Sequence, residues 1–151
     1  MHVRTQIRNA VSAALSGLVT PVTILTEPHR RIDPEDLPAV LISTTDDEPQ
    51  PDQMVMGSPN YGVERTQSVS VELHAGGGDG VAIAETIDQM DLEVEQAISA
   101  DATLAGLAEI VVMTENTIEW NSDQDYILAA RTVVYSVSWR HTFGAPDVPE
   151  G

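Results

Sequence analysis

The acidic residues before the last strand-like segment are spaced like the start of a calcium-binding loop. Asn121, Asp123 and Asp125 alternate along the chain, and oxygen ligands at the first, third and fifth positions open such loops. The sixth position, however, is Tyr126 instead of the required glycine, and the twelfth is Thr132 instead of glutamate. An acidic hairpin turn explains the spacing better, and no metal site is assigned there.

A glycine-rich stretch, residues 76–80, precedes a helix-like segment, as in loops that cradle phosphate. No Lys-Ser or Lys-Thr pair follows it, and Asp79 would place a carboxylate where the phosphate must lie. We therefore expect a flexible turn over residues 75–78, with Asp79 as the N-cap of the helix.

Four histidines are scattered along the sequence, and none belongs to an HExxH or Gly-x-Ser-x-Gly pattern. His74 and His141 each end a long strand-like segment, so they would approach each other if these strands were neighbours. Such a pair would allow a metal site or a proton relay, and solvated strand-end histidines are the alternative. No catalytic residue is assigned.

The composition bounds the class of protein. The 151 residues suit one domain, and 24 acidic residues against seven arginines and no lysine give a net charge of −17. This composition argues against a free-standing nucleic-acid binder, because neutralising phosphates requires a basic surface. The absence of cysteine excludes disulfides and thiolate sites, and no 18-residue apolar run occurs. We expect a soluble protein made in the cytoplasm.

Two segments, 65–74 and 131–141, alternate apolar and polar residues. This period is typical of strands with one face in the core and the other in water or on a partner. A third segment, 37–44, is apolar without alternation, which favours the central strand of a sheet. Residues 46–62 carry four acidic residues and three prolines, and predict a long loop.

Apolar residues at steps of three and four predict two helices, one near the start of the chain and one just past its middle. The expected elements are a helix at 3–18, strands at 22–25 and 37–44, the loop at 46–62, a strand at 65–74, a helix at 79–98, and strands at 108–120 and 131–141. This order predicts an α+β fold, with a mixed, mostly antiparallel sheet of four or five strands and two helices packed on one face. Residues 1–144 form a single domain, and 145–151 form a flexible tail.

The helix at 79–98 has an acidic outer side, with Glu85, Asp88, Asp91 and Glu95 at steps of three or four. Like charges at this spacing destabilise a helix by about 0.2–0.5 kcal/mol per pair, so we expect a partner to offset them. Arg4 and Arg8 lie four residues apart in the first helix, and we expect them to pair with carboxylates elsewhere.

The order of these segments resembles the lambda-type phage tail terminator family, also called minor tail protein U. The resemblance rests on the Leu-Pro-Ala-Val strand at 37–42, which runs into acidic residues at 44–48, and on the strand at 68–74. It continues with the helix at 83–98, its Asp-x-x-Leu continuation at 101–107, and the closing strand at 135–139. It spans nearly the whole chain.

The resemblance implies a structural virion protein, not an enzyme, that needs no cofactor. Its copies would form a hexameric ring that caps the tail tube of a siphophage-like particle, stops tube polymerisation and joins the tube to the head. The implied partners are other copies of the chain, the tail tube protein and the head–tail connector or neck protein. DNA would pass through the lumen without specific binding, and no membrane is involved. The protein would reside at the head-proximal end of the virion tail, after synthesis in the host bacterial cytoplasm.

Three sets of residues become candidates under this resemblance. The charged residues of the two helices would form the interface between copies in the ring: Arg4, Arg8, Glu85, Asp88, Asp91 and Glu95. An apolar tip within the long loop would contact the tube or connector, or would instead fold back as a lid on the core: Met54, Val55, Met56 and Tyr61. Acids after the third segment and the polar positions of the two alternating strands would line the lumen or the ring surface: Asp46, Asp47, Glu48, Ser68, Ser70, Glu72, Ser136, Ser138 and Arg140.

Other functions fit the same residues. A head-completion or neck protein, or a tail tube protein of the same phage, would show similar patterns. A metal-binding enzyme domain that uses His74 and His141 is an alternative from a different class, as is an acidic DNA-mimic inhibitor of the antitoxin kind. Filaments of the purified chain would favour the tube protein, and discrete rings would favour the terminator.

Overall fold

The chain folds into one mixed sheet with helices against it. The computed structural model describes residues 1–18, 20, 22–26, 32–51, 62–101, 103–123, 125–142 and 144–145; for residues 45–48, 50, 51 and 142 it describes the backbone alone. The elements are α1 (Val3–Leu15), β1 (Thr23–Leu25), the 3-10 turn η1 (Pro34–Asp36), β2 (Ala39–Pro51), β3 (Gly62–Gly77), α2 (Gly80–Ala100), β4 (Ile110–Asp123) and β5 (Tyr126–Thr142).

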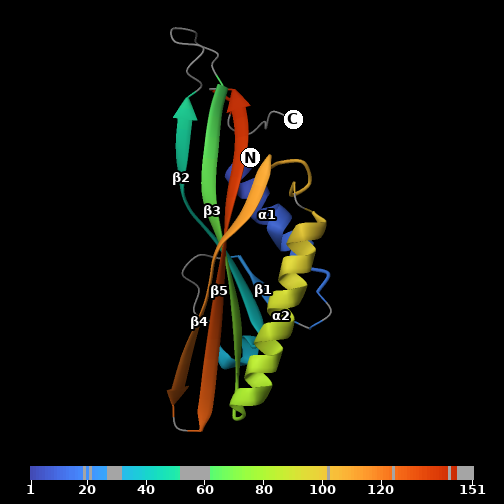
Figure 1. Cartoon of the computed structure of the whole chain (residues 1–151), viewed down its shortest axis with the longest axis vertical. Coiled ribbons are helices and arrows are strands. Elements are labelled where there is room, and N and C mark those ends of the chain that lie inside the picture. Colours follow the sequence, from blue (N-terminus) through green and yellow to red (C-terminus); the bar gives the residue numbers. More distant parts are fainter. Residues whose placement is uncertain are drawn as a thin grey trace.

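The five strands lie in the order β1-β2-β3-β5-β4. β1 runs parallel to β2, and every other neighbouring pair is antiparallel. Both helices pack on the same face of this sheet (Figure 1). The predicted α+β fold, with a mostly antiparallel mixed sheet and two helices on one face, is therefore confirmed.

The core lies between this face and the helices. α1 buries four residues at helical spacing: Val3, Ile7, Val11 and Leu15. Under α2, Val71 and Leu73 of β3 and Val133 of β5 are inaccessible to solvent. These are the apolar positions of the two alternating segments, so the period of two places one face of β3 and β5 in the core, as predicted.

The middle strand is β3, so the prediction that residues 37–44 form the central strand is wrong. β2 lies second from one side, and β1 pairs with only its first three residues, 39–41. Ala39 is buried on one face of β2, and Val40 and Ile42 are buried on the other, which explains why this stretch is apolar without alternation. Beyond Leu41, β3 is the one neighbour of β2 in the described part of the chain.

The prediction of a loop at 46–62 is wrong for residues 46–51, which belong to β2, and for Gly62, which begins β3; residues 52–61 lie outside the described residues. The 16 residues of β3 supply partners for the acidic stretch, with Glu48 opposite Thr66 and Pro51 opposite Val63. A bulge between Thr44 and Asp47 shifts the register. Prolines are tolerated in this part of β2 because it lies at an edge of the sheet.

The ends of α2 and β3 also differ from expectation. Asp79 is the N-cap of α2, as predicted, and its carboxylate accepts a hydrogen bond from the Val81 amide at 3.0 Å. Gly76 and Gly77, however, belong to β3 and not to a turn. A Cβ on Gly76 would lie 2.8 Å from the Tyr126 hydroxyl, so close packing explains this glycine better than flexibility does.

The remaining boundaries move by a few residues. α1 ends at Leu15 instead of residue 18, and the 121–125 turn shortens because β4 reaches Asp123 and β5 begins at Tyr126. Of the predicted tail, only Ala145 is among the described residues. Neither α1 nor α2 is long and apolar enough to cross a membrane.

Candidate interaction surfaces

The face of the sheet opposite the helices, here called the open face, is lined by short polar side chains. Ser68 of β3 is opposite Ser136 of β5, and Thr66 is opposite Ser138, with 3.2 Å between the two hydroxyl oxygens of the second pair. The six polar positions of the alternating strands all lie on this face: Ser68, Ser70, Glu72, Ser136, Ser138 and Arg140. The structure thus gathers them into one surface.

Charges on the open face are largely compensated at its Arg140 end. The Arg140 guanidinium lies 3.5 Å from a carboxylate oxygen of Glu64 and 3.7 Å from one of Glu109. All three side chains are about half exposed, so each ion pair contributes little to stability. The two carboxylates nevertheless balance the charge of the arginine at this end of the face.

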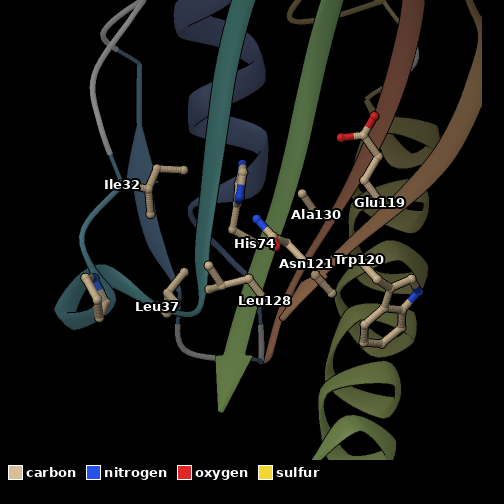
Figure 2. Close-up of a pocket in the computed structure, with 10 residues that line it drawn as sticks. Ile32, Leu37, His74, Glu119, Trp120, Asn121, Leu128 and Ala130 are labelled. Atoms are coloured by element: carbon tan, nitrogen blue, oxygen red, sulfur yellow. The ribbon is translucent and has the colours of Figure 1, made fainter. Parts of the chain in front are cut away.

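A shallow hollow of about 500 Å³ lies on the open face beside η1. Figure 2 shows Leu37 and Leu128 below His74 in this view, with Glu119 and Trp120 of β4 to the right. The His74 ring lies 3.4 Å from Glu72, and this hydrogen bond holds the pKa of Glu72 below its usual value, against the opposing effect of burial. The lining mixes apolar side chains with His74, Glu119 and Asn121.

His74 and His141 do not meet, so the expectation that the two histidines could approach each other in a metal site or proton relay is wrong. Their strands are neighbours, but β3 and β5 are antiparallel, and His141 is opposite Val63. Val63 and His74 are 11 positions apart (74 − 63), or roughly 36 Å along a strand. His141 is buried and accepts a hydrogen bond from Arg65 at 2.7 Å. Within the described ranges, no three His, Asp or Glu side chains could hold a metal ion together.

The acidic side of α2 is partly compensated within the chain. Arg131 of β5 lies 3.9 Å from Asp88 and donates a hydrogen bond to Asn116 of β4 at 2.8 Å. Asn116 in turn donates to Asp91 at 3.3 Å. These contacts link α2 to β4 and β5. Sequence reasoning missed them because Arg131 lies far from α2 in the chain. Of the four acids proposed for a ring interface, Glu85 and Glu95 remain exposed without an ion pair in the described structure.

The two arginines of α1 differ in exposure. Arg4 is exposed, and its Nε donates to His2 at 3.4 Å. Arg8 is partly buried, and its Nε has no hydrogen-bond partner in the part of the chain that the structure describes. Arg4 is therefore the better placed of the two for contact with another molecule.

Several candidates lie outside the described residues. Met54, Val55, Met56 and Tyr61 are among these, so their assignment to tube or connector contact stays a prediction. The backbone of Asp46, Asp47 and Glu48 belongs to β2, where Glu48 has an open-face register position opposite Thr66. Their side chains fall outside the description.

Tyr135 lies beneath α2 with its hydroxyl buried and without a hydrogen-bond partner among the described groups. Burial, and then the charges of Asp91 and Glu95, raise the pKa of Tyr135 to about 12. Because an orphaned buried hydroxyl costs about 1–3 kcal/mol, we expect Tyr135→Phe to raise the free energy of unfolding by about 1 kcal/mol at pH 7.

The same substitution should change the alkaline stability of the protein. The unfolded tyrosine loses its proton near pH 10 and the folded one near 12, so wild type should lose stability as the pH rises from about 10 and level off above about 12. Urea titrations at pH 7 and across this range would measure both effects. Tyr126→Phe is the control at a more exposed ring, and an equal change in the two variants would contradict the assignment.

Sequence reasoning also missed the exposure of β4. This strand is last in the sheet order, yet Ile110, Val112, Met113 and Trp120 are 56, 50, 36 and 49% exposed. The apolar run at 110–113 looks like any buried strand, and nothing local distinguishes an edge strand from an inner one.

Neither a scan against protein-family models nor a search of curated proteins found a match to this chain. Among solved structures, the fold is similar to a chain in the virion of a native gene transfer agent particle. The two are 12% identical, with a TM-score of 0.38, and the match covers 91% of this chain and 92% of the other. A similarity at this level leaves function to be argued from the surfaces themselves.

Proposed function

We propose that this chain is a structural protein of a phage-like virion. Its copies form a hexameric ring that caps the tail tube, stops its polymerisation and joins it to the head connector. The observation that carries the proposal is the open face: its β3 and β5 positions are mainly short hydroxyl side chains, its Arg140 is held in ion pairs, and its β4 edge is acidic. The order of sequence elements, which resembles tail terminators, supports the same reading.

The ring requires two different patches that meet between neighbouring copies. Exposed Arg4 on α1 supplies a positive patch, and exposed Glu85 and Glu95 on α2 supply a negative one. Asp88 and Asp91 contribute less, because Arg131 and Asn116 already bind them. Charge complementarity of this kind fixes the register of the neighbours more than it adds affinity.

The open face is assigned to the lumen. Short hydroxyl side chains leave room for a DNA duplex. Arg140 forms ion pairs with Glu64 and Glu109, which compete with any contact to a DNA phosphate. Each copy adds a net charge of −17, so the ring repels DNA and lets it pass without being bound.

Native mass spectrometry tests the ring directly. Wild type is expected to be a hexamer, and Arg4→Glu is expected to shift most of the protein to monomer because it opposes like charges across the interface. Arg140→Glu is the matched control, since it makes the same charge change on an exposed arginine of the open face. It should leave the hexamer intact.

The alternatives predict different results. Long filaments of wild type would favour a tail tube protein, and a ring that binds a connector yet fails to stop tube growth would favour a neck protein. A monomer at every concentration, or equal loss of the hexamer in both variants, would contradict the proposed interface.

A further inference from the structure

β4 presents a long free edge. It spans 14 residues, Ile110–Asp123, and pairs with β5 on one side alone in the described part of the chain (Figure 1). Its other side therefore carries a row of backbone N–H and C=O groups that no strand satisfies there. Edges of this kind pair readily with another chain unless something blocks them.

The two sides of the sheet differ in how strongly they resist pairing with an added strand. The part of β2 beyond Leu41, where β3 is its one described neighbour, carries a bulge after Thr44, prolines at 49 and 51, and a run of acids, all of which discourage pairing. β4 contains no proline, although it too has a bulge, between Met113 and Glu115, and three acids, Glu115, Glu119 and Asp123. Beyond that bulge, nine residues run in regular register with β5 to Asp123.

The two faces of this regular stretch, residues 115–123, differ in chemistry. Its acids lie on the open face, because Glu119 is opposite Ala130, the β5 partner of His74. Glu115 and Asp123 share that face by register. Ile118 and Trp120 lie on the helix side, where Trp120 is half exposed. A strand added here would meet carboxylates on one face and apolar side chains on the other.

Charge determines what kind of strand fits. The nearest arginines are occupied, Arg131 by Asp88 and Asn116, and Arg140 by Glu64 and Glu109. No ion pair to Glu115, Glu119 or Asp123 is found among the described residues. A second copy would bring further acids and a net charge of −17 to this edge, so a basic protein is the better occupant.

We propose that β4 receives a β-strand from a different, basic protein, which extends the sheet beyond β4. The incoming strand carries Arg or Lys on the open-face side, beside Glu115 and Glu119, and apolar residues on the helix side, beside Trp120. Main-chain hydrogen bonds supply the affinity, and the alternation of side chains supplies the specificity. This surface is independent of the α1–α2 interface in the proposed ring.

Two synthetic peptides test the proposal. One has 12 residues of alternating arginine and valine, and the other has glutamate in place of arginine. Because Trp139 is fully buried, iodide quenching reports Trp120. The Arg–Val peptide should shield Trp120 and slow hydrogen exchange of the β4 amides, and the Glu–Val peptide should do neither. Glu119→Arg should weaken Arg–Val binding by about tenfold or more, whereas Glu35→Arg, an exposed control on η1, should not.

Three results would overturn the proposal. If the two peptides had equal effects, the incoming strand would not need to be basic. If hydrogen exchange of the β4 amides were unchanged at saturating Arg–Val peptide, no strand would pair with β4. Concentration-dependent protection of β4 in the protein alone would show that a second copy covers this edge. Mass spectrometry of the same samples reports the ring separately, so its loss is distinguishable from the loss of strand binding.

Discussion

Replacing Trp139 by alanine is expected to lower the free energy of unfolding by about 3–5 kcal/mol, whereas Trp120→Ala should cost less than about 1 kcal/mol. Both tryptophans lie on the helix side of neighbouring strands. Trp139 is fully buried in the core, while Trp120 is half exposed on β4. Because a domain of this size is stable by only about 5–15 kcal/mol, the first change should leave a marginal fold.

Urea unfolding followed by circular dichroism measures both variants on the same scale. The tryptophan that remains in each variant adds a second observation: Trp139 should emit at short wavelength with little quenching, and Trp120 should behave as a largely solvated ring. Equal losses of stability would mean that Trp120 is buried in solution, which would contradict the exposed β4 edge.

The faces of the strands could be predicted from the sequence, because side-chain period is a local property. Alternation in β3 and β5 identified the buried Val71 and Val133 and the polar Ser68 and Ser136. The helix at 79–98 and its Asp79 cap were equally local, and both are found in the structure. The open face was accessible to prediction for the same reason.

Strand order could not be predicted, because pairing joins residues that are distant in the chain. An apolar run fits an inner strand, yet β4 is an edge and β2 has only a short neighbour in β1. Antiparallel pairing separates His74 from His141, although each ends its strand. The contact of Arg131 with Asp88 likewise depends on how α2 crosses the sheet. Surfaces formed by the pairing of distant strands could therefore be identified only from the structure.

The two faces of β3 should respond oppositely to one added charge. Val71 lies between Ile42 and Val133, all fully buried, whereas Ser70 lies between Ser43 and Val134 on the open face. Val71→Asp places an unpaired carboxylate in the core, and we expect it to cost about 4 kcal/mol or more. Ser70→Asp adds the same charge one residue away and should change stability by less than about 1 kcal/mol.

Circular dichroism and urea titration of the two variants separate a core position from a surface one without any assumption about function. Ser70→Asp then serves a second purpose, because it adds one negative charge per copy to the face assigned to the lumen. If that face lines an open channel, the charges of neighbouring copies stay in water and the hexamer should survive, with a stronger dependence on salt. If native mass spectrometry instead shows that Ser70→Asp abolishes the ring while the fold persists, the open face is a contact between copies, and the lumen must be lined by other residues.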